Sequence, residues 1–435
     1  MASRRGRDVT RVPGDKSISH RALLLGALAE GENQLTGLLP GADCQSTRSV
    51  LGRLGVELPE LPDDAGLLTF RGVGVAGLRA PDGGPLDCGN SGTTARLLLG
   101  LLAGAGVRAT LTGDDSLRSR PMRRVTEPLS AMGAEFREEG EEGRLPIRVE
   151  SGVQHTLEYR TPVASAQIKS ALLLAGLAAG VAVTVSEPDR SRDHTERMLR
   201  MAGVPIHQEV VGSRWKVSLP APPVGVSRWS LSPFTMDVPG DFSSAIFLIA
   251  LGLLREGDPL RLKHVGINPT RTGALPVLER MGARIRYEST RSLDGDVGEP
   301  VADLVVRPGS LTATTIGAAE IPSLIDEVPI LAAVASRARG RTVIRGAEEL
   351  RVKESDRIHA LVTNLRILGV DVEEFPDGLA VTGSERPLEG SVETYHDHRI
   401  AMAFAVLGAL PGNRIDIEDP SLVEISYPGF WEALG

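Results

Sequence analysis

Apolar helical runs recur six times along the chain, each opening on polar residues and closing on glycine. The runs read SISHRALLLGALAEG, NSGTTARLLLGLLAG, SAQIKSALLLAGLAAG, DFSSAIFLIALGLLREG, LIDEVPILAAVASRARG and HDHRIAMAFAVLGALPG, and their closing glycines are Gly31, Gly104, Gly180, Gly257, Gly340 and Gly412. A glycine after the last periodic residue is a typical helix stop. A helix that is apolar on every side must be buried. The pattern therefore predicts six buried helices, each followed by a strand.

A second pattern, an amphipathic helix closed by glycine, alternates with the first. Its copies read LGRLGVEL, LSAMGAEF, LRMAGVPI, LERMGARI, LRILGVDV and the final FWEALG, with glycines Gly55, Gly133, Gly203, Gly282, Gly369 and Gly435. The chain is interpreted as six repeats of roughly 65 to 90 residues, which is too long for an ordinary solenoid and suits closed α/β domains. Six repeats divide into two domains of three, with the proline-containing stretch Ser227 to Asp241 as the candidate boundary.

Polar and charged residues gather at the starts of these otherwise apolar helices. They are Lys16, Ser17 and Arg21; Asn90, Ser91, Gly92 and Arg96; Ser165, Gln167 and Lys169; Asp326 and Glu327; and His396, Asp397, His398 and Arg399. Taken singly, such residues are helix caps or cations that reach solvent. Taken together they are unusual, because a helix N-terminus is already partly positive and disfavours cations. We therefore expect a site for strongly anionic ligands, bound by helix N–H groups and by Lys and Arg.

The segment RVKESDRIHAL adds two more cations. Lys353 and Arg357 are four residues apart, so an amphipathic helix through this segment would present both on one face. We expect that face to contribute to the same anion site.

The composition limits the partners. The net charge is −8, aromatic residues make up 3% and no long basic tract is present, so we expect no nucleic-acid partner. The longest apolar run, Ala171 to Val185, is broken by two glycines and is too short to span a bilayer, so no membrane association is expected. Two cysteines and a basic N-terminus without an apolar core favour a cytoplasmic location.

Three further motifs do not support another function. RGVGVAGL matches the dinucleotide-binding glycine pattern, but no apolar helix follows it. His396 and His398 have metal-ligand spacing but no third ligand nearby, so we expect no metal and no other cofactor. Cys88 is interpreted as a small buried hydrophobe and not as a nucleophile.

Eight motifs resemble those of one family. GDKSISHRALLL, GNSGTTARLL, LRSRPM, SAQIKSALLLAGL, SRDHTERML, IDEVPILA, RVKESDRI and DHRIAMAF follow one another in the order expected of 5-enolpyruvylshikimate-3-phosphate synthases, and the match covers nearly the whole chain. The resemblance implies an α/β, two-domain enolpyruvyl transferase fold. Each domain would hold three βαβαββ units whose buried helices point their N-termini at the interdomain cleft.

The resemblance also implies the domain bounds and the reaction. One domain would span residues 15–235, mainly on the shikimate 3-phosphate side. The other would combine 1–14 with 236–435 and hold most of the phosphoenolpyruvate side and the catalytic carboxylates. The family transfers the enolpyruvyl group of phosphoenolpyruvate to the 5-hydroxyl of shikimate 3-phosphate and releases phosphate, by addition and elimination through a tetrahedral intermediate. This reaction belongs to the shikimate pathway, which leads to chorismate and the aromatic amino acids.

Site residues carried over from the family fall into three groups. Shikimate 3-phosphate would be held by Lys16, Ser17, Arg21, Ser165, Gln167 and Ser191; phosphoenolpyruvate would be held by Lys16, Gly92, Arg120, Arg357 and Arg399; and Asp326 and Lys353 would face the 5-hydroxyl. Asp326 resembles the family's base and Glu354 its acid, with Lys16 assisting. We expect Gly92 to leave open space for the ligand, so that glyphosate, an anion resembling phosphoenolpyruvate, competes there.

Two rival functions remain open at this point. A UDP-N-acetylglucosamine enolpyruvyl transferase would share the fold, but that family has Lys-Asn where this chain has Lys16-Ser17, and usually a cysteine in the loop GDDSLRSRPM. A non-catalytic anion-binding protein would have no use for carboxylates at Asp326 and Glu354. Ile425 stands where many family members have lysine, which removes one expected phosphoenolpyruvate contact. We expect a monomer.

Overall fold

The computed structural model describes residues 10–62, 66–296 and 298–435, and the chain forms two compact units. The N-terminal unit consists of Gly14–Val238 together with Ser292–Glu299. The C-terminal unit consists of Met1–Pro13, described from Thr10 on, Pro239–Arg291 and Pro300–Gly435. The chain thus passes from one unit to the other four times, and the short excursion at Ser292–Glu299 has no counterpart in the repeat pattern.

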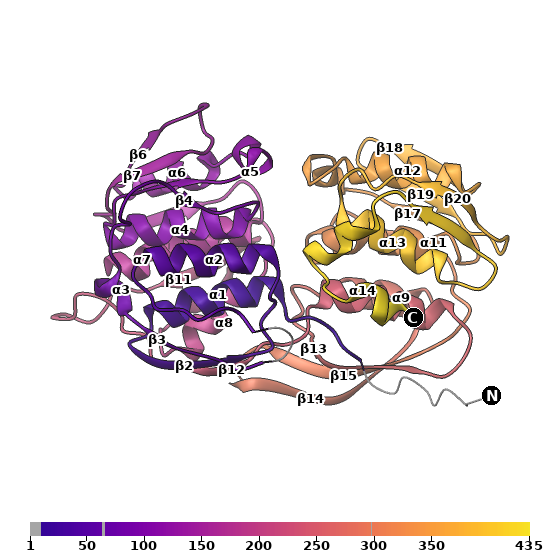
Figure 1. The fold of residues 1–435 in the computed structure, drawn as a ribbon, viewed down its shortest axis with the longest axis horizontal. Helices are drawn as coiled ribbons and strands as arrows, with labels where there is room; N and C mark the ends of the chain where they lie inside the picture. The colour runs from indigo at the N-terminus through magenta and orange to yellow at the C-terminus, as the bar shows by residue number, and fades with distance from the viewer. Residues whose placement is uncertain (1–9, 63–65, 297) are drawn as a thin grey trace. The chain divides into compact units, whose positions relative to one another are not determined.

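The N-terminal unit contains three sheets and the first three buried helices (Figure 1). Its helices are α1 (Lys16–Leu28), α2 (Ala42–Arg53), α3 (Gly74–Gly77), α4 (Gly92–Ala105), α5 (Asp115–Ser119), α6 (Arg123–Ala131), α7 (Ala166–Ala179) and α8 (His194–Met201). Its strands are β2 (Gly31–Thr36), β3 (Leu68–Gly72), β4 (Leu86–Asp87), β5 (Ala109–Thr112), β6 (Glu135–Glu138), β7 (Ile147–Ser151), β8 (Leu157–Arg160), β9 (Val183–Glu187), β10 (His207–Val211), β11 (Arg214–Leu219) and β12 (Thr235–Asp237).

The C-terminal unit repeats this plan with α9, α11 and α13 as its buried helices. Its helices are α9 (Phe242–Leu254), α10 (Ala274–Arg280), α11 (Val328–Ala335), α12 (Arg357–Ile367), α13 (His398–Gly408) and α14 (Phe430–Leu434), with short 3₁₀ turns η1 (Ile321–Ser323), η2 (Ile325–Glu327), η3 (Glu348–Val352) and η4 (Pro420–Ile425). Its strands are β1 (Thr10–Arg11), β13 (Leu260–Gly266), β14 (Arg284–Asp296), β15 (Pro300–Arg307), β16 (Thr315–Ile316), β17 (Arg341–Ile344), β18 (Asp371–Phe375), β19 (Gly378–Thr382), β20 (Glu389–Val392) and β21 (Arg414–Ile417).

Each sheet of the N-terminal unit combines one parallel pair with antiparallel neighbours. The strand orders are β12-β2-β3, β4-β5-β7-β6 and β10-β11-β9-β8. A parallel pair needs a crossover connection, and α4 and α7 supply it for β4–β5 and β8–β9. The strands before α1 and α9 are exchanged: β1 pairs with β13, whereas β12 pairs with β2. The C-terminal unit has the orders β1-β13-β15-β14, β16-β17-β19-β18 and β20-β21.

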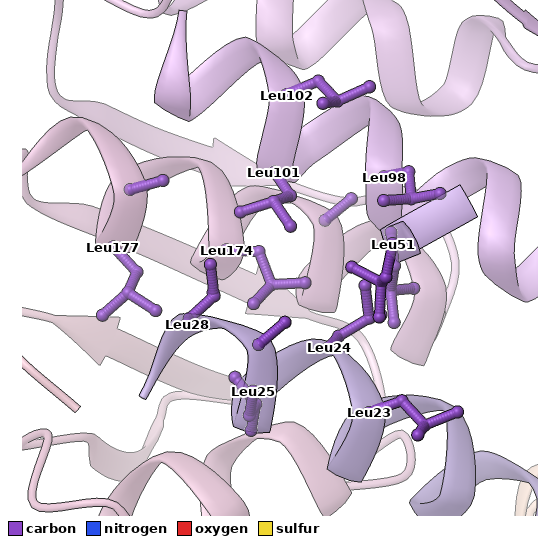
Figure 2. Close-up of a cluster of buried hydrophobic side chains, with 14 of the residues drawn as sticks. Leu23, Leu24, Leu25, Leu28, Leu51, Leu98, Leu101, Leu102, Leu174 and Leu177 are labelled. Atoms are coloured by element: carbon purple, nitrogen blue, oxygen red, sulfur yellow. The ribbon is translucent and has the colours of Figure 1, made fainter. Parts of the chain in front are cut away.

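Leucines from four helices form the core of the N-terminal unit. Side chains of α1, α2, α4 and α7 meet in one cluster (Figure 2), and Leu24, Leu51, Leu98 and Leu177 are fully buried there. Burial of a leucine side chain contributes about 1.5–3 kcal/mol. The six buried helices predicted from the sequence are confirmed, and glycine stops such as Gly180, with a φ of 73°, take the left-handed conformation expected of a helix end.

Small residues fix the register of α4 against α7. A Cβ atom added at Gly100 would lie 2.1 Å from the carbonyl oxygen of Ala171, and one added at Gly104 would lie 2.3 Å from that of Ala175. Both pairs are separated by the same number of positions, so the two helices run parallel with their backbones in contact. Their first turns therefore lie at the same end.

One predicted helix is wrong in its extent. α12 begins at Arg357, where the Asp356 carboxylate accepts the His359 N–H at 3.0 Å, and Lys353 lies before it, just beyond η3. Lys353 and Arg357 therefore do not share a helical face. Asp356 starts the helix later than the pattern suggested, because an aspartate that caps the backbone is more favourable at a helix start than in its interior.

Candidate active site

The parallel register of α4 and α7 brings together the first polar side chains of both helices. The Arg96 Nη1 donates to Gln167 Oε1 at 2.8 Å, and Gln167 Nε2 donates to Thr93 Oγ1 at 3.1 Å. Arg96 is 9% exposed, and its buried Nε has no hydrogen-bond partner within the described residues. Gln167 therefore holds a buried guanidinium that still has an unsatisfied donor.

Arg21 joins α1 to this group. Its Nε donates to Thr195 Oγ1 at 2.6 Å and its Nη2 donates to Ser170 Oγ at 2.9 Å, while Nη1 donates to the Ser17 carbonyl at 2.9 Å. All three acceptors are neutral, and the side chain is 4% exposed. Arg21 thus buries a positive charge that no carboxylate of the described residues pairs with directly.

Lys16, the first residue of α1, forms an ion pair with Asp43 in the first turn of α2. The pair is partly accessible, with side-chain exposures of 30% for Lys16 and 15% for Asp43. Burial acts to raise the pKa of Asp43, but Lys16 and then His20 act more strongly together and lower it. Lys16 is therefore a cation held at the helix start by a partner carboxylate.

Arg120 follows the short helix α5 and lies beside the start of α4. Its Nη2 donates to Asn90 Oδ1 at 2.7 Å and to Ser116 Oγ at 3.1 Å. A Cβ atom at Gly92 would lie 2.8 Å from Arg96 Nη1 and 3.5 Å from Arg120 Nη1. The expectation that Gly92 leaves open space is wrong, because two guanidinium groups lie above it.

We call Lys16, Ser17, Arg21, Gly92, Arg96, Arg120, Ser165 and Gln167 the Lys16 cluster. Burial lowers the pKa of Arg21 to about 10, an effect that Glu196 and Asp15 only partly oppose. Burial likewise lowers the pKa of Arg96 to about 10, and Arg124 and Arg120 lower it further. Both arginines remain charged at neutral pH, and burial outweighs the negative charge around Arg21.

Ser165 is the N-cap of α7, and its Oγ accepts the Ile168 N–H at 3.5 Å, which leaves its own proton free to donate.

Ser191 is arranged differently, since its hydroxyl donates to the Glu187 carboxylate at 2.7 and 2.9 Å. The single proton of Ser191 is therefore engaged by Glu187. Lys169 points inward too: it is fully buried between Glu187 at 2.8 Å and Glu196 at 2.9 Å, so the expectation that it contributes to an anion site is wrong.

In the C-terminal unit, Arg357 organises a second group. Its Nε donates to Asp397 at 2.7 Å, its Nη2 donates to Glu354 at 2.7 Å, and its Nη1 lies 3.4 Å from the Asp326 carboxylate. Arg357 is 1% exposed. Burial acts to lower its pKa, but Asp397, Glu354 and Asp326 together raise it above its usual value.

The turn η2, which precedes α11, and the first turn of α13 meet in this group. Asp397 is the N-cap of α13 and accepts the Arg399 N–H at 2.9 Å, and Arg399 Nη1 donates to the Asp326 carbonyl at 3.0 Å. Arg271, which the sequence patterns did not single out, lies 3.3 Å from Asp241 and 3.8 Å from Asp326. We call Asp326, Glu354, Arg357, Asp397, Arg399 and Arg271 the Asp326 cluster.

Two carboxylates of this region have opposite pKa shifts. Burial acts to raise the pKa of Glu354, but Arg357 outweighs it and lowers the value. Burial raises the pKa of Glu327, which the Arg271 charge only partly offsets. Glu327 is 1% exposed and accepts a hydrogen bond from Ser243 Oγ at the start of α9.

Lys353 and Ile425 lie outside these contacts. Lys353 Nζ is 3.8 Å from the Glu349 carboxylate, and Ile425 is an exposed residue at the end of η4. Sequence reasoning noted Arg96 and Asp397 among the helix starts but gave neither a role, and it missed Arg271. The signal for Arg96 was its place within an apolar helix, where a charge must be buried.

The metal and nucleophile alternatives gain no support. Among the described residues no group of three or more His, Cys, Asp or Glu could hold a metal ion. Cys88 is fully buried, and burial raises the pKa of its thiol well above the usual range. In residues 10–62, 66–296 and 298–435, no helix has the length and apolarity needed to cross a bilayer.

Comparison with solved structures defines the class of fold. The enolpyruvyl transferase NikO from Streptomyces tendae matches with a TM-score of 0.72 over 100% of this chain and 95% of its own, at 17% identity, a likeness of fold alone. An EPSP synthase from Acinetobacter baumannii matches with a TM-score of 0.85 and 40% identity over 98% of this chain and 94% of its own. The protein therefore has the two-domain α/β enolpyruvyl transferase fold.

Sequence comparisons identify the family. The model of EPSP synthase (3-phosphoshikimate 1-carboxyvinyltransferase) matches residues 4–434. A 3-phosphoshikimate 1-carboxyvinyltransferase from Alkalilimnicola ehrlichii is 49% identical over 98% of this chain and 92% of its own length, and one from Thermus thermophilus is 49% identical over 98% and 95%. The chain belongs to the EPSP synthase family.

Proposed function

We propose that this chain transfers the enolpyruvyl group of phosphoenolpyruvate to the 5-hydroxyl of shikimate 3-phosphate, releasing phosphate as a 3-phosphoshikimate 1-carboxyvinyltransferase. The observation that supports this most directly is the Lys16 cluster. Arg21, Arg96 and Arg120 are bonded to neutral groups only within the described residues. Partly or fully buried cations without carboxylate partners favour binding of phosphate or carboxylate anions.

Shikimate 3-phosphate is assigned to the part of the Lys16 cluster at the starts of α1 and α7. Lys16, Ser17, Arg21 and Gln167 supply donors at the starts of α1 and α7, and Ser165 adds a hydroxyl whose proton is free. Free N–H groups at a helix start favour phosphate as well. Ser191 remains in this proposal as a support that Glu187 orients, and Arg192, whose charge acts on Arg21, adds positive charge nearby.

For phosphoenolpyruvate, the proposal keeps the residues implied by the family resemblance, which are Lys16, Gly92, Arg120, Arg357 and Arg399. Asp326 is assigned as the base for the 5-hydroxyl, with Lys353 facing the same hydroxyl. The Asp326 carboxylate lies 3.4 Å from Arg357 Nη1 and 3.8 Å from Arg271 Nη1, and these two contacts fix its orientation. Metal and organic cofactors have no part in this proposal.

Glu354 is assigned as the acid that protonates the methylene carbon. Arg357 lowers the pKa of Glu354 and so keeps it ionised in the free protein. An anionic substrate bound at Arg357 weakens this effect and raises the pKa toward the range that an acid needs. Substrate binding would therefore prepare the acid.

The test is phosphate release with each acceptor, using the purified full chain and phosphoenolpyruvate. Shikimate 3-phosphate should give release and UDP-N-acetylglucosamine should give none. The reverse result would assign the protein to the other enolpyruvyl transferases, and binding of both anions without release would make it a non-catalytic binder. Glu354→Gln should bind both substrates and turn over at least 100-fold more slowly, since general acid catalysis contributes about 10²–10⁴-fold.

Three finer points complete the proposal. The protein acts as a monomer in the cytoplasm, which sedimentation and cell fractionation would test. The reaction serves chorismate and aromatic amino acid biosynthesis, so the gene should relieve an aromatic auxotroph. Crystals soaked with shikimate 3-phosphate should show its phosphate against Ser165 and Gln167.

A further inference from the structure

Glu187 is a buried carboxylate at a position where the strand pattern calls for a hydrophobic residue. It ends β9, in which Val183, Val185 and Glu187 are the buried members of an alternating strand. The carboxylate is 0% exposed. An isolated charge in that position is strongly unfavourable, so it must be stabilised by its ion-pair and hydrogen-bond partners.

Three hydrogen-bond donors converge on this carboxylate. Lys169 Nζ donates to Oε2 at 2.8 Å, and the backbone N–H of Ser165 donates to Oε1 at 3.0 Å. The Ser191 hydroxyl lies 2.7 Å from Oε1 and 2.9 Å from Oε2. Glu187 therefore ties the N-cap of α7 and the loop before α8 to one buried lysine.

Glu196 provides an internal comparison. It is also 0% exposed and lies 2.9 Å from the same lysine, yet it bonds to neither Ser165 nor Ser191. Its further contact is with Gln208 Nε2 at 3.5 Å. The lysine thus has two carboxylate partners, of which only Glu187 reaches the start of α7.

The support matters because the Ser165 N–H bonds to Glu187, whereas the Ser165 carbonyl accepts the Lys169 N–H at 3.1 Å and the side-chain capping bond is long. The Ser165 Oγ accepts the Ile168 N–H at 3.5 Å, near the limit of a hydrogen bond. The direction of its free hydroxyl proton depends on the backbone that carries it. A displacement of about 1 Å in a binding group can change a rate as much as 100-fold.

We infer that Glu187 is a positioning residue for the phosphate of the acceptor substrate, which it serves by holding the Ser165 backbone and the Ser191 hydroxyl at the start of α7. This inference deepens the proposed function and depends on it. Buried ion pairs are weak sources of stability, so the role of Glu187 lies in geometry, and Lys169 is the counter-charge that allows a carboxylate in this place.

The experiment compares Glu187→Gln with its matched control Glu196→Gln in the full chain. In the Glu187→Gln variant the Lys169 ammonium attracts the amide oxygen, so the amide NH₂ faces the Ser165 N–H and the bond is lost. The variant should raise the KM and the calorimetric Kd for shikimate 3-phosphate about tenfold, since a lost hydrogen bond to a charged group is worth roughly that factor. The KM for phosphoenolpyruvate should stay within about twofold.

Glu196→Gln should leave both KM values within about twofold while lowering Tm to a similar extent. Equal changes in the KM for shikimate 3-phosphate in the two variants, or a Glu187→Gln variant altered only in Tm, would overturn the inference. Ser165→Ala distinguishes a failure of the inference about Glu187 from a failure of the proposed phosphate site. If it raises the KM for shikimate 3-phosphate and Glu187→Gln does not, only the inference fails; if Ser165→Ala changes nothing, the proposed phosphate site fails and the inference with it.

Discussion

The Lys16 cluster and the Asp326 cluster are both built from helix starts, but their buried arginines have opposite kinds of partner. In the N-terminal unit, Arg21 and Arg96 are bonded to hydroxyl, amide and carbonyl groups, and burial lowers the pKa of each to about 10. In the C-terminal unit, Arg357 contacts three carboxylates, which raise its pKa despite burial. The first arrangement leaves positive charge uncompensated, whereas the second neutralises it internally.

Under the proposed function, this difference distinguishes a cluster that binds substrate anions from a cluster that transfers protons. Uncompensated buried charge is unfavourable in the free protein and is relieved when an anion binds. Internally paired charge holds carboxylates in defined positions, as a base and an acid require. Under the proposed function, the Lys16 cluster would bind the acceptor phosphate while the Asp326 cluster supplies the base and the acid, and each prediction below tests one side of that division.

Lys16→Met should have the largest effect on the N-terminal side. Loss of this cation should lower kcat by about 10²–10⁴-fold, the range for a group that assists proton transfer. The pair with Asp43 is partly accessible, so far-UV circular dichroism and Tm should change little. Full activity in the variant would contradict the assignment of Lys16.

Arg357→Met and Arg21→Met should separate the clusters by stability. Removing Arg357 leaves the buried Asp397 carboxylate without its main partner and should lower the free energy of unfolding by roughly 3–5 kcal/mol. Removing Arg21 leaves Ser170 and Thr195 bonded to each other at 2.6 Å, so the loss should be under about 1.5 kcal/mol.

Urea unfolding would measure the difference in stability between the two arginine variants. Equal destabilisation would mean that the two clusters are not distinguished by charge pairing. Binding of shikimate 3-phosphate, measured by calorimetry, should be lost in Arg21→Met.

Two buried histidines, one in each unit, should make the protein less stable in acid. Burial lowers the pKa of His20 to about 3 and that of His398 to about 4, and nearby cations contribute to both shifts. Each histidine is neutral when folded but gains a proton near pH 6.5 when unfolded. Stability is therefore full above pH 6.5 and falls as pH drops, down to about pH 4 for His398 and about pH 3 for His20.

His20→Gln and His398→Gln should each reduce that slope by about 1.4 kcal/mol per pH unit between pH 6 and 4, as expected for one proton. Unfolding by urea at several pH values gives the slope. An unchanged slope in either variant would show that the histidine is already protonated in the folded unit.

Gly92→Ala should have the smallest effect. The added methyl group meets the flexible ends of Arg96 and Arg120, which can move, so the protein should fold normally. Displaced guanidinium groups should raise the KM for phosphoenolpyruvate a few-fold. Glyphosate should inhibit the unaltered protein in competition with phosphoenolpyruvate, and its inhibition constant should rise in the variant. Equal inhibition constants would contradict a ligand at Gly92.

Gly100→Ala is the matched control on the same helix. Its methyl group would lie 2.1 Å from the Ala171 carbonyl oxygen, a backbone atom that cannot move away. This variant should lower Tm, which Gly92→Ala should leave nearly unchanged.

Much of the fold could be predicted from the sequence because helix period and glycine stops are local. The six buried helices, their order and the strand after each were predicted correctly, since an all-apolar helix has no alternative to burial. The start of α12 was predicted wrongly, because the capping by Asp356 competes with an amphipathic period that continues into the preceding residues.

Within the candidate site, the sequence identified residue types but not their partners. Lys16 and Lys169 have the same charge and both lie near a helix start, yet one is partly accessible and the other fully buried between two glutamates. The partners of Lys169 are 18 and 27 positions away on β9 and α8, so no local pattern joins them. Contacts across such distances depend on how helices pack.

The sequence by itself determined the repeated helices, their polar starts and the family, because periodicity and motif order are properties of the chain. Only the tertiary structure decided which charges are compensated. Gly100 and Gly104 bring α4 against α7, and that contact places Arg96 on Gln167. The reason is physical: the energy of a charge depends on the groups around it in space, and those groups come from segments far apart along the chain.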